Sequence, residues 1–420
     1  MRQSAFNHIA PLPKGGYALY NFHTGNCMLL STLSRDFYDN FELYGQDCPQ
    51  VQELVDLGFL VDYDEHAYLR NRLQLKCGDT RKLRLTVCPT LQCNFACPYC
   101  FESARTGKMS EQVQDNLVAF TRTMLERYRS AGLDVSWFGG EPTLEPEIIR
   151  CLTERFVALC DELGIPYWAS AITNGFLLNT ELAELFDECH VESVQITLDG
   201  PDAATHDETR HLKGGQGSFE RIMENIRAFN GKADIVVRCN VHKENAGRYS
   251  ELQRQLLDFA REENRQISVY PGHMDGHGAY RNRAMDESEF ACFMGDNCSS
   301  VDRFCFSGPI CMAPKLLDMV VDEQGNLYKC LESVGRDSES FGNVADFDFE
   351  VPQSGNMDVL SEWLGFAWPD DEECMACPIL PLCLGGCPQH RREGKRACHC
   401  VRHYLDEYVV ALVEQGVGKS

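Results

Sequence analysis

Short apolar runs alternate with amphipathic stretches through the middle of the chain, with the periods expected of strands and helices. The predicted strands are residues 83–88, 135–138, 167–173, 193–198, 235–240 and 266–270. The predicted helices between them are residues 110–131, 146–163, 180–188, 217–229 and 248–261. Strict alternation of strand and helix favours a parallel sheet with right-handed crossovers. Six such units predict an α/β fold with an open, partial (β/α)6 barrel, whose chemistry is expected where strands run into the following loops.

The residues before the barrel predict a small α+β unit. Its hairpin has strands at residues 17–21 and 27–30 and turns across residues 23–26. Two short helices are expected after it, near residues 34–41 and 49–57. A polar connection over residues 68–81 then leads into the first barrel strand.

The residues after the barrel are rich in loop-forming residues. A hairpin is expected within residues 318–330, with its turn at Gln324, Gly325 and Asn326. A helix over residues 402–414 closes the chain. The sequence therefore predicts three domains: an N-terminal α+β unit, a TIM-like partial barrel and a loop-rich C-terminal domain, over residues 1–81, 82–290 and 291–420.

Composition narrows the possible partners. The chain has 420 residues, of which 44% are hydrophobic and 24% charged, as in ordinary globular proteins. Its formal net charge of −24 would repel a phosphate backbone, so nucleic-acid binding through a broad basic face is not expected. No run of about 18 uninterrupted apolar residues predicts a membrane span, and the N-terminus lacks the apolar core of about 7–15 residues that a signal peptide has. We therefore expect a cytoplasmic protein with no membrane partner.

The 22 cysteines are the most informative residues, because clustered cysteines in a reducing compartment usually bind metal. The segment CNFACPYC directly follows the first barrel strand and places Cys93, Cys97 and Cys100 in a C-x3-C-x2-C array. A cubane 4Fe–4S cluster needs four ligands, so three thiolates would leave one iron open. The alternatives are a three-thiolate zinc site or three unrelated buried thiols. Position at the carboxyl end of a barrel strand favours a reactive metal site.

This array resembles the cluster motif of radical S-adenosylmethionine enzymes, and the resemblance extends along the barrel. WFGGEP, ITNG and ITLDGP follow the second, third and fourth predicted strands, at residues 137–142, 172–175 and 196–201. His206, Asp207 and Arg210 then match the family's HD-x2-R segment. Each match is weak by itself, since Asn-Gly is also a common turn signal. Together, at successive strand ends, they are hard to obtain by accident.

The resemblance implies that Cys93, Cys97 and Cys100 hold a catalytic 4Fe–4S cluster, whose free iron binds S-adenosylmethionine. It places the cofactor contacts at Gly139, Gly140, Glu141, Asn174, Thr197 and Arg210. The glycines and Glu141 would hold the amino group, and Arg210 would pair with the carboxylate, as suits a planar guanidinium. Thr197 would lie near the ribose or carboxylate, and Asn174 is a ribose candidate.

A second group of cysteines lies near the C-terminus. CMACPILPLCLGGC gives a C-x2-C-x5-C-x3-C array at Cys374, Cys377, Cys383 and Cys387. Before it come Cys305, Cys311 and Cys330, and after it come Cys398 and Cys400. Taken without the barrel, a pair of structural zinc sites is an equal alternative. Most of the eleven cysteines outside the predicted ligand sets, such as Cys27, Cys151, Cys160 and Cys239, are predicted to be small buried hydrophobic residues.

With the barrel, this pattern resembles the SPASM domain of peptide and protein maturases, which holds two auxiliary 4Fe–4S clusters. The resemblance assigns the first to Cys305, Cys311, Cys330 and Cys387. It assigns the second to Cys374, Cys377, Cys383 and one later cysteine, for which Cys400 is favoured slightly over Cys398. The expected cofactors are thus three 4Fe–4S clusters and S-adenosylmethionine. Full ligation suggests electron transfer or stability as the role of the auxiliary pair, and their loss should unfold this segment.

The resemblance implies a radical SAM enzyme that modifies a ribosomally made peptide. A 5′-deoxyadenosyl radical would remove a hydrogen atom, and the product would be a crosslink, such as a thioether or C–C bond, or another oxidative modification. The expected partners are a precursor peptide or protein and an electron donor such as flavodoxin or ferredoxin. Residues 1–81 resemble a peptide-binding module, and a leader peptide could pair with a strand edge there. A capping domain without a ligand is weighed equally.

Two other functions stay open. An anaerobic sulfatase maturase, which forms formylglycine, resembles the chain from the cluster loop onward but carries an Asp where Leu331 follows Cys330 here; Glu332 is a possible substitute. A zinc-ribbon interaction protein on an inert barrel is the non-catalytic alternative. Finally, the loop at residues 272–280 brings His273, Asp275 and His277 near the barrel mouth, where we expect it to line a substrate channel or to be an ordinary loop.

Overall fold

The computed structural model describes residues 1–102, 105–274, 280–297, 310–365, 371–396 and 398–416. It divides into two compact units. The flanking unit consists of Met1–Cys77, Asp286–Cys311 and Phe366–Ser420, and the barrel unit of Gly78–Met285 and Met312–Gly365. This is a different partition from the three predicted domains, whose boundaries stay a prediction. Within the described residues, none of the helices is long and apolar enough to cross a membrane.

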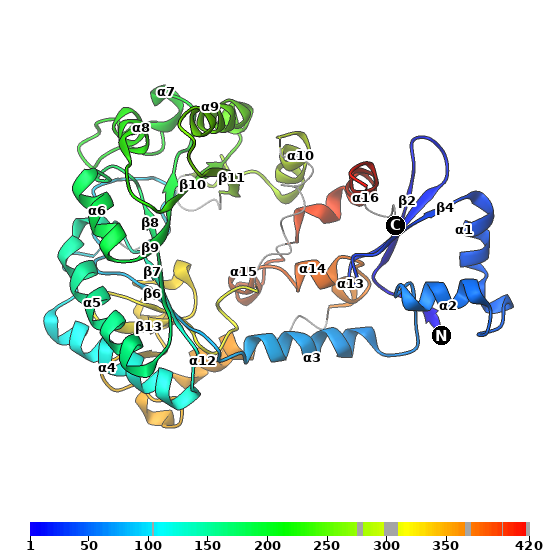
Figure 1. The fold of residues 1–420 in the computed structure, drawn as a ribbon, viewed down its shortest axis with the longest axis horizontal. Coiled ribbons are helices and arrows are strands. Elements are labelled where there is room, and N and C mark those ends of the chain that lie inside the picture. The colour runs from blue at the N-terminus through cyan, green and yellow to red at the C-terminus, as the bar shows by residue number, and fades with distance from the viewer. Residues whose placement is uncertain (103–104, 275–279, 298–309, 366–370, 397, 417–420) are drawn as a thin grey trace. The chain divides into compact units, whose positions relative to one another are not determined.

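The barrel unit contains the predicted parallel sheet with its crossover helices (Figure 1). Its six parallel strands are β6 (Leu83–Val87), β7 (Leu133–Trp137), β8 (Tyr167–Thr173), β9 (Val191–Thr197), β10 (Asp234–Val241) and β11 (Ile267–His273). Its helices are α4 (Glu111–Tyr128), α5 (Pro146–Leu163), α6 (Thr180–Glu188), α7 (Ala203–His206), α8 (Phe219–Ala228) and α9 (Tyr249–Glu262), with short 3-10 turns η2 (Pro142–Leu144) and η3 (Ala246–Arg248). The α/β fold predicted from alternation is confirmed.

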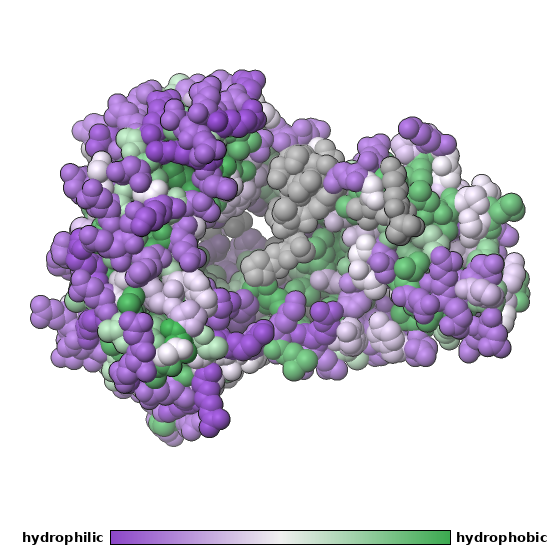
Figure 2. Space-filling view, in the orientation of Figure 1, coloured by the Kyte–Doolittle hydropathy of each residue, from purple (hydrophilic) through white to green (hydrophobic). Residues whose placement is uncertain are grey.

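Local sequence explains these elements. In β6 the residues Leu83, Leu85 and Val87 alternate onto the buried side, as a strand requires. Helix α4 begins at the predicted cap, where the Ser110 side chain accepts a hydrogen bond from the Val113 N–H. Helix α5 ends at Gly164, whose left-handed φ of 67° is a common helix stop. The outer face of this helical layer is largely hydrophilic (Figure 2).

The predicted hairpin after the barrel is confirmed, and it extends the barrel sheet. Strand β12 (Asp318–Val321) pairs in parallel with β6, and β13 (Asn326–Tyr328) and β14 (Gly342–Asn343) follow antiparallel. Asp322 shapes the turn, because its carboxylate accepts the N–H groups of Gln324 and Asn326. The remaining elements here are η5 (Leu331–Ser333), η6 (Asp337–Glu339), η7 (Pro352–Ser354) and α12 (Met357–Leu364). The free edge of the first barrel strand is therefore covered by residues from far along the chain.

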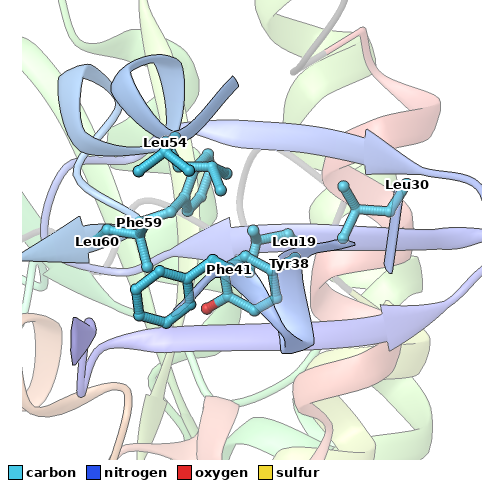
Figure 3. Close-up of a cluster of buried hydrophobic side chains, with 8 residues drawn as sticks. Leu19, Leu30, Tyr38, Phe41, Leu54, Phe59 and Leu60 are labelled. Carbon is cyan, nitrogen blue, oxygen red and sulfur yellow. The ribbon is translucent and has the colours of Figure 1, made fainter. Parts of the chain in front are cut away.

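The flanking unit holds the predicted N-terminal hairpin. It is β3 (Tyr17–Asn21) and β4 (Cys27–Leu30), and β2 (Asn7–Pro11) adds a third antiparallel strand. The other N-terminal elements are β1 (Arg2–Gln3), which pairs with β5 (Leu60–Val61), and α1 (Thr32–Asp39), η1 (Phe41–Leu43) and α2 (Pro49–Asp56). Leu19, Tyr38 and Phe59 lie at the centre of its core, which Figure 3 shows between the strands and the helices.

The polar connection predicted over residues 68–81 is wrong. Helix α3 (Glu65–Cys77) occupies most of it, because Leu69 and Leu73, one turn apart, pack against Phe6 and Leu380. The narrow apolar stripe lies among charged residues and is hard to see in the sequence. Glu65 is also buried, and its carboxylate accepts hydrogen bonds from Ser4 and from the Ala5 N–H.

The C-terminal part of the flanking unit consists of short helices around the last cysteines. They are α10 (Glu287–Asn297), α13 (Glu372–Met375), α14 (Leu380–Cys383), α15 (Pro388–Arg392), η8 (Cys400–His403) and α16 (Leu405–Glu414). Helix α16, the predicted final helix, packs its Tyr408 and Val409 against the β2–β3 face. Among the cysteines predicted to be buried, Cys160 and Cys239 are buried, whereas Cys151 is exposed, because it lies on the outer face of α5.

Candidate active site

The carboxyl ends of the barrel strands surround one cavity of about 300 Å³. Nine residues predicted from the sequence line it: Cys93, Cys97, Cys100, Gly139, Gly140, Glu141, Asn174, Thr197 and Arg210. They come from the segments that follow β6, β7, β8 and β9, so parallel pairing of the strands brings them to one end of the sheet. The structure places these residues together, and their individual roles stay predictions.

The cluster loop, residues 93–100, is held by the residues that directly follow the HD-x2-R segment. Ala96 donates its N–H to the His211 carbonyl, and Lys213 donates its N–H to the Asn94 carbonyl. Burial raises the pKa of Cys93 to about 12 and that of Cys100 to about 11. A thiol with such a pKa stays protonated near neutral pH until a metal ion replaces the proton.

Gly139 and Gly140 pack against the backbone that leads into the cluster loop. A Cβ atom at Gly139 would lie 2.4 Å from the Thr90 carbonyl oxygen, and one at Gly140 would lie 2.2 Å from that of Gln92. Gly139 also has a φ of 118°, which side chains rarely adopt. The resemblance described above assigns these glycines to the amino group of S-adenosylmethionine. The structure shows in addition that the chain itself requires them.

Glu141 is buried and joins the ends of β7 and β8. Its Oε1 accepts hydrogen bonds from the Thr143 and Thr173 hydroxyl groups, each at 2.6 Å, and its Oε2 accepts the Asn174 N–H at 2.7 Å. Burial raises the pKa of this carboxyl group, and these hydrogen bonds act in the opposite direction. Glu141 therefore fixes the shape of the cavity wall, whatever contact it makes with a ligand.

Arg210 is buried beside the cluster loop. It donates from one terminal nitrogen to the Tyr99 hydroxyl at 2.9 Å, and its guanidinium carbon lies 5.6 Å from the centre of the Phe95 ring. Its Nε has no hydrogen-bond partner among the described residues. Because leaving a buried N–H without an acceptor costs about 1–3 kcal/mol, an acidic ligand group would satisfy it. The predicted pairing of Arg210 with a carboxylate fits this geometry.

Two further predicted residues have internal partners. The Asn174 amide donates to the Asn94 side chain at 2.7 Å, and its oxygen accepts the Phe176 N–H. Asn174 thus braces the cluster loop against the end of β8. Asp207 of the HD-x2-R segment accepts the N–H groups of Ser218 and Phe219, which are the first donors of α8.

His206 has a defined tautomer. Its Nδ1 accepts the Asp199 N–H at 3.1 Å, so its Nε2 carries the proton and faces the Ser218 hydroxyl at 3.1 Å. The Ser218 hydroxyl in turn donates to the Arg210 carbonyl. Burial, with a smaller contribution from Arg210, lowers the pKa of His206 well below its usual range. His206 therefore supports the Arg210 backbone as a neutral residue.

Several cavity residues were missed in the sequence. The side chains of Gln195, Arg238 and Asn240 also line the cavity. The Nε of Arg238 donates a hydrogen bond to the Asn240 side chain at 2.9 Å. The signal was strand alternation, because Thr197 is aligned with Arg238 in the β9–β10 ladder and residues two apart share a face. Glu102 also lines the cavity, and burial together with Glu141 raises its pKa to about 8. No short sequence signal distinguishes Glu102.

The loop after β11 is partly described. His273 lines the cavity, and its Nε2 lies 2.8 Å from the Met285 carbonyl. Asp275 and His277 lie outside the described residues, so a role for the loop stays a prediction. Leu331 and Glu332, from η5, line the same cavity.

The C-terminal cysteines lie in both units. Cys330 begins η5 in the barrel unit, whereas Cys387 begins α15 and Cys311 lies exposed in the flanking unit. Cys305 and the Cys400 side chain lie outside the described residues. In the flanking unit, burial raises the pKa of Cys377, with a smaller contribution from its neighbours Cys374 and Cys398, and burial raises that of Cys383, with a smaller contribution from Cys398 and Cys377. The structure thus brings together Cys374, Cys377, Cys383 and Cys398.

No three His, Cys, Asp or Glu side chains form a site for a single metal ion in the part of the chain that the structure describes. A four-iron cluster holds its thiolates farther apart than one ion does, so cluster sites have a different geometry. The donor sets are soft thiols, which select iron–sulfur clusters or zinc.

Comparison with known proteins identifies the barrel. The family model described as "Radical SAM superfamily" matches residues 87–252. The chain is 30% identical over 177 residues to the mycofactocin maturase of Mycobacterium ulcerans, an alignment that spans 41% of each protein. It is 23% identical to a cysteine-type anaerobic sulfatase-maturating enzyme of Clostridium novyi, over 71% of this chain and 86% of the relative. It is 24% identical to a PqqA peptide cyclase of Xanthomonas euvesicatoria, over 71% of this chain and 80% of the relative.

Two solved structures share the fold. Native anSMEcpe with bound AdoMet and Kp18Cys peptide aligns with a TM-score of 0.61 and 19% identity, over 80% of this chain and 98% of that one. Streptococcus suis SuiB bound to the precursor peptide SuiA aligns with a TM-score of 0.53 and 16% identity, over 94% and 97%. The strand-end motifs, the shared cavity and the family match agree. Residues 87–252 therefore form a radical SAM domain, and the maturase relatives indicate that the chain is an enzyme.

Proposed function

We propose that the chain is a radical SAM peptide maturase that installs a crosslink or another oxidative modification in a ribosomally made peptide. The observation that carries the proposal is the cavity lined by all nine predicted residues, where the Nε of Arg210 has no hydrogen-bond partner within the described part of the chain. Relatives named as a peptide cyclase and a mycofactocin maturase support a polypeptide substrate. An alignable structure contains a precursor peptide.

In this proposal each part of the cavity has its own task. Cys93, Cys97 and Cys100 would hold the 4Fe–4S cluster, and Arg210 would bind the carboxylate of S-adenosylmethionine. Together these cofactors supply one-electron chemistry that ends in removal of a hydrogen atom from an unactivated C–H bond. The chain's residues orient the substrate and exclude water around it. Phe95 and Phe138 form apolar walls of the cavity and would exclude water from it.

The polar side of the cavity would face the substrate. Gln195, Arg238 and Asn240 offer amide and guanidinium groups from neighbouring strands. Rigid strand ends fix such groups well enough to hold one C–H bond in place. The two auxiliary clusters would accept or relay an electron, and a flavodoxin or ferredoxin would supply the first one.

A leader peptide would bind the flanking unit. In its three-stranded sheet, β4 is an outer strand and β2 the other, in the order β2-β3-β4. Helix α16 covers one face of this sheet. A peptide strand would instead pair along the edge of an outer strand. Many of the exposed large apolar side chains of the chain lie in this N-terminal part, among them Leu29, Leu33 and Leu43.

Anaerobic reconstitution tests the proposal. We expect brown protein with about twelve irons per chain, from three clusters of four. With dithionite and S-adenosylmethionine it should form 5′-deoxyadenosine, and with its precursor peptide the product should have lost two hydrogen atoms. Colourless protein loaded with zinc would contradict the proposal, and so would iron-loaded protein that never cleaves S-adenosylmethionine.

A sulfatase maturase is the second candidate, favoured by the position of Glu332. In sulfatase maturases, an Asp directly follows the cysteine that corresponds to Cys330. Here Leu331 and then Glu332 follow Cys330, and both line the cavity. A carboxylate there could take a proton from a substrate cysteine or serine. The test is a peptide with a sulfatase-type cysteine. Formylglycine, detected by its aldehyde reaction with a hydrazine, would rank this activity above crosslinking.

A further inference from the structure

Two cysteine sulfurs in the flanking unit accept hydrogen bonds from guanidinium groups: Arg391 donates to Cys374 at 3.1 Å, and Arg402 donates to Cys398 at 3.1 Å. Hydrogen-bonded sulfur is the environment that an iron–sulfur cluster uses.

The two arginines are held in place by one ion-pair network. Arg391 contacts Asp371 at 3.4 Å, and Arg402 contacts Glu373 at 3.1 Å. Arg396 bridges both carboxylates. Arg391 also donates from its Nε to the Gly385 carbonyl at 2.8 Å. The two guanidinium groups are thus anchored on one side and directed at sulfur on the other.

A cluster with four thiolate ligands carries a net negative charge, and reduction adds one more. A cation in hydrogen-bond contact with its sulfurs stabilises the reduced form more than the oxidised form. The surroundings are partly buried, since Cys374 is 7% exposed, so solvent screens this interaction only in part. Two such arginines should therefore make the cluster easier to reduce.

We propose that Cys398, rather than the Cys400 favoured in the sequence, is the fourth ligand of the auxiliary 4Fe–4S cluster expected at Cys374, Cys377 and Cys383. We propose also that Arg391 and Arg402 raise the reduction potential of this cluster through their contacts with Cys374 and Cys398. The inference rests on the iron–sulfur content proposed above, and it is independent of which peptide is modified. Arg391 and Arg402 are positioning and tuning residues, because they act through the cluster ligands.

Iron analysis tests the ligand. Cys398→Ser should reduce the iron content from about twelve to about eight per chain, while Cys400→Ser should leave about twelve. The reverse pattern would overturn the assignment of Cys398. Wild-type protein without iron would instead contradict the proposed function itself, so the two failures are distinguishable.

Redox titration followed by electron paramagnetic resonance tests the arginines. Each of Arg391→Gln and Arg402→Gln should lower the equilibrium constant for one-electron reduction of this cluster at least tenfold, which is about 59 mV. Lys395→Gln is the matched control, because the described hydrogen bond of the Lys395 side chain goes to Glu393. It should change the constant clearly less. Equal shifts in all three variants, or none, would overturn the proposal.

Lysine variants cover the case in which a glutamine variant loses its cluster. Arg391→Lys and Arg402→Lys keep the charge but replace the planar fork with a hydrated ammonium group. We expect them to retain about twelve irons and a potential between those of the wild type and the glutamine variants. Cluster loss in the lysine variants too would assign the arginines to folding alone and contradict the proposal.

Discussion

The hydroxyl group of Tyr99 donates a hydrogen bond to the carboxylate of Asp199, and both side chains are buried. Tyr99 lies in the cluster loop, directly before Cys100, whereas Asp199 follows β9. The same hydroxyl accepts a hydrogen bond from Arg210. This one atom therefore connects the cluster loop, the fourth barrel strand and the predicted carboxylate-binding residue.

Replacing Tyr99 with Phe should loosen the site without removing a ligand. Asp199 would lose a donor and Arg210 an acceptor, so we expect the free energy of unfolding to fall by about 1–3 kcal/mol. The KM for S-adenosylmethionine should rise because Arg210 is no longer fixed. Urea unfolding and steady-state kinetics measure the two effects. Tyr128→Phe is the control, because the Tyr128 hydroxyl has no hydrogen-bond partner among the described residues, and unchanged behaviour in both variants would contradict the prediction.

Gly140→Ala should disrupt the cavity by steric clash. The new methyl group would lie 2.2 Å from the Gln92 carbonyl oxygen, so the cluster loop would have to move. We expect a loss of about 1–3 kcal/mol of stability and a reduced occupancy of the catalytic cluster. Gly247→Ala is the control, because nothing lies within 4 Å of its added methyl group. Thermal unfolding and iron analysis compare them, and equal stability of the two variants would refute the explanation.

His206 predicts a dependence of stability on pH. The folded protein holds His206 neutral, because burial lowers its pKa well below the usual value near 6.5. Below about pH 6.5 the unfolded chain takes up a proton that the folded chain refuses, so stability falls as the pH falls. The contribution of His206 to the slope of unfolding free energy against pH should approach about 1.4 kcal/mol per pH unit. This contribution should be absent in His206→Asn. Urea unfolding at pH 7.5, 6.5 and 5.5 measures this slope for the wild type and for His206→Asn. Parallel slopes in the two proteins would contradict the prediction.

Helix α3 offers a matched pair of leucine variants. Leu73 is 6% exposed and packs in a cluster with Phe6, Cys374 and Leu380, whereas Leu75 on the same helix is 77% exposed. Leu73→Ala should lose about 2–5 kcal/mol of stability, and Leu75→Ala should be nearly neutral. Because Cys374 belongs to the same cluster, Leu73→Ala should also lower the iron content. An equal effect of the two variants in chemical unfolding would exclude this packing argument.

Replacing Cys93, Cys97 and Cys100 together with Ala separates the catalytic cluster from the auxiliary ones. Formation of 5′-deoxyadenosine should stop, while about eight irons per chain remain. The measurement is iron analysis with liquid chromatography of the nucleoside. Residual S-adenosylmethionine cleavage in this variant would place the catalytic iron elsewhere.

The regular part of the fold was readable in the sequence because each element has a clear local signal. Helix α5, for instance, begins at Pro146 and ends before Gly164, and these two residue types are strong signals of a helix start and a helix end. Helix α3 lacked such signals, since its apolar stripe is two leucines wide. The pairing of β12 with β6 is a contact between distant parts of the chain, and local periodicity carries no information about it.

The candidate site could be predicted from the sequence to a similar extent. Cysteine spacing and glycine motifs pointed to the cavity, because those residue types have few other uses in such arrays. Gln195 carries no motif of its own and has a partner from another strand, and the hydrogen bond between Tyr99 and Asp199 of the ITLDGP motif joins two segments far apart in the sequence. Arg391 and Arg402 are ordinary surface residues in the sequence, and only folding shows that each reaches a sulfur atom.

The pairing of β12 with β6 also bears on the order in which the protein is assembled on the ribosome. When the first barrel strand and the cluster loop emerge, one edge of that strand has no partner until residues 318–321 have been made. Bare strand edges attract other chains, so polypeptides truncated before this point should aggregate. Iron insertion at Cys93 would accordingly come after residues 318–321 have emerged and paired with the first barrel strand.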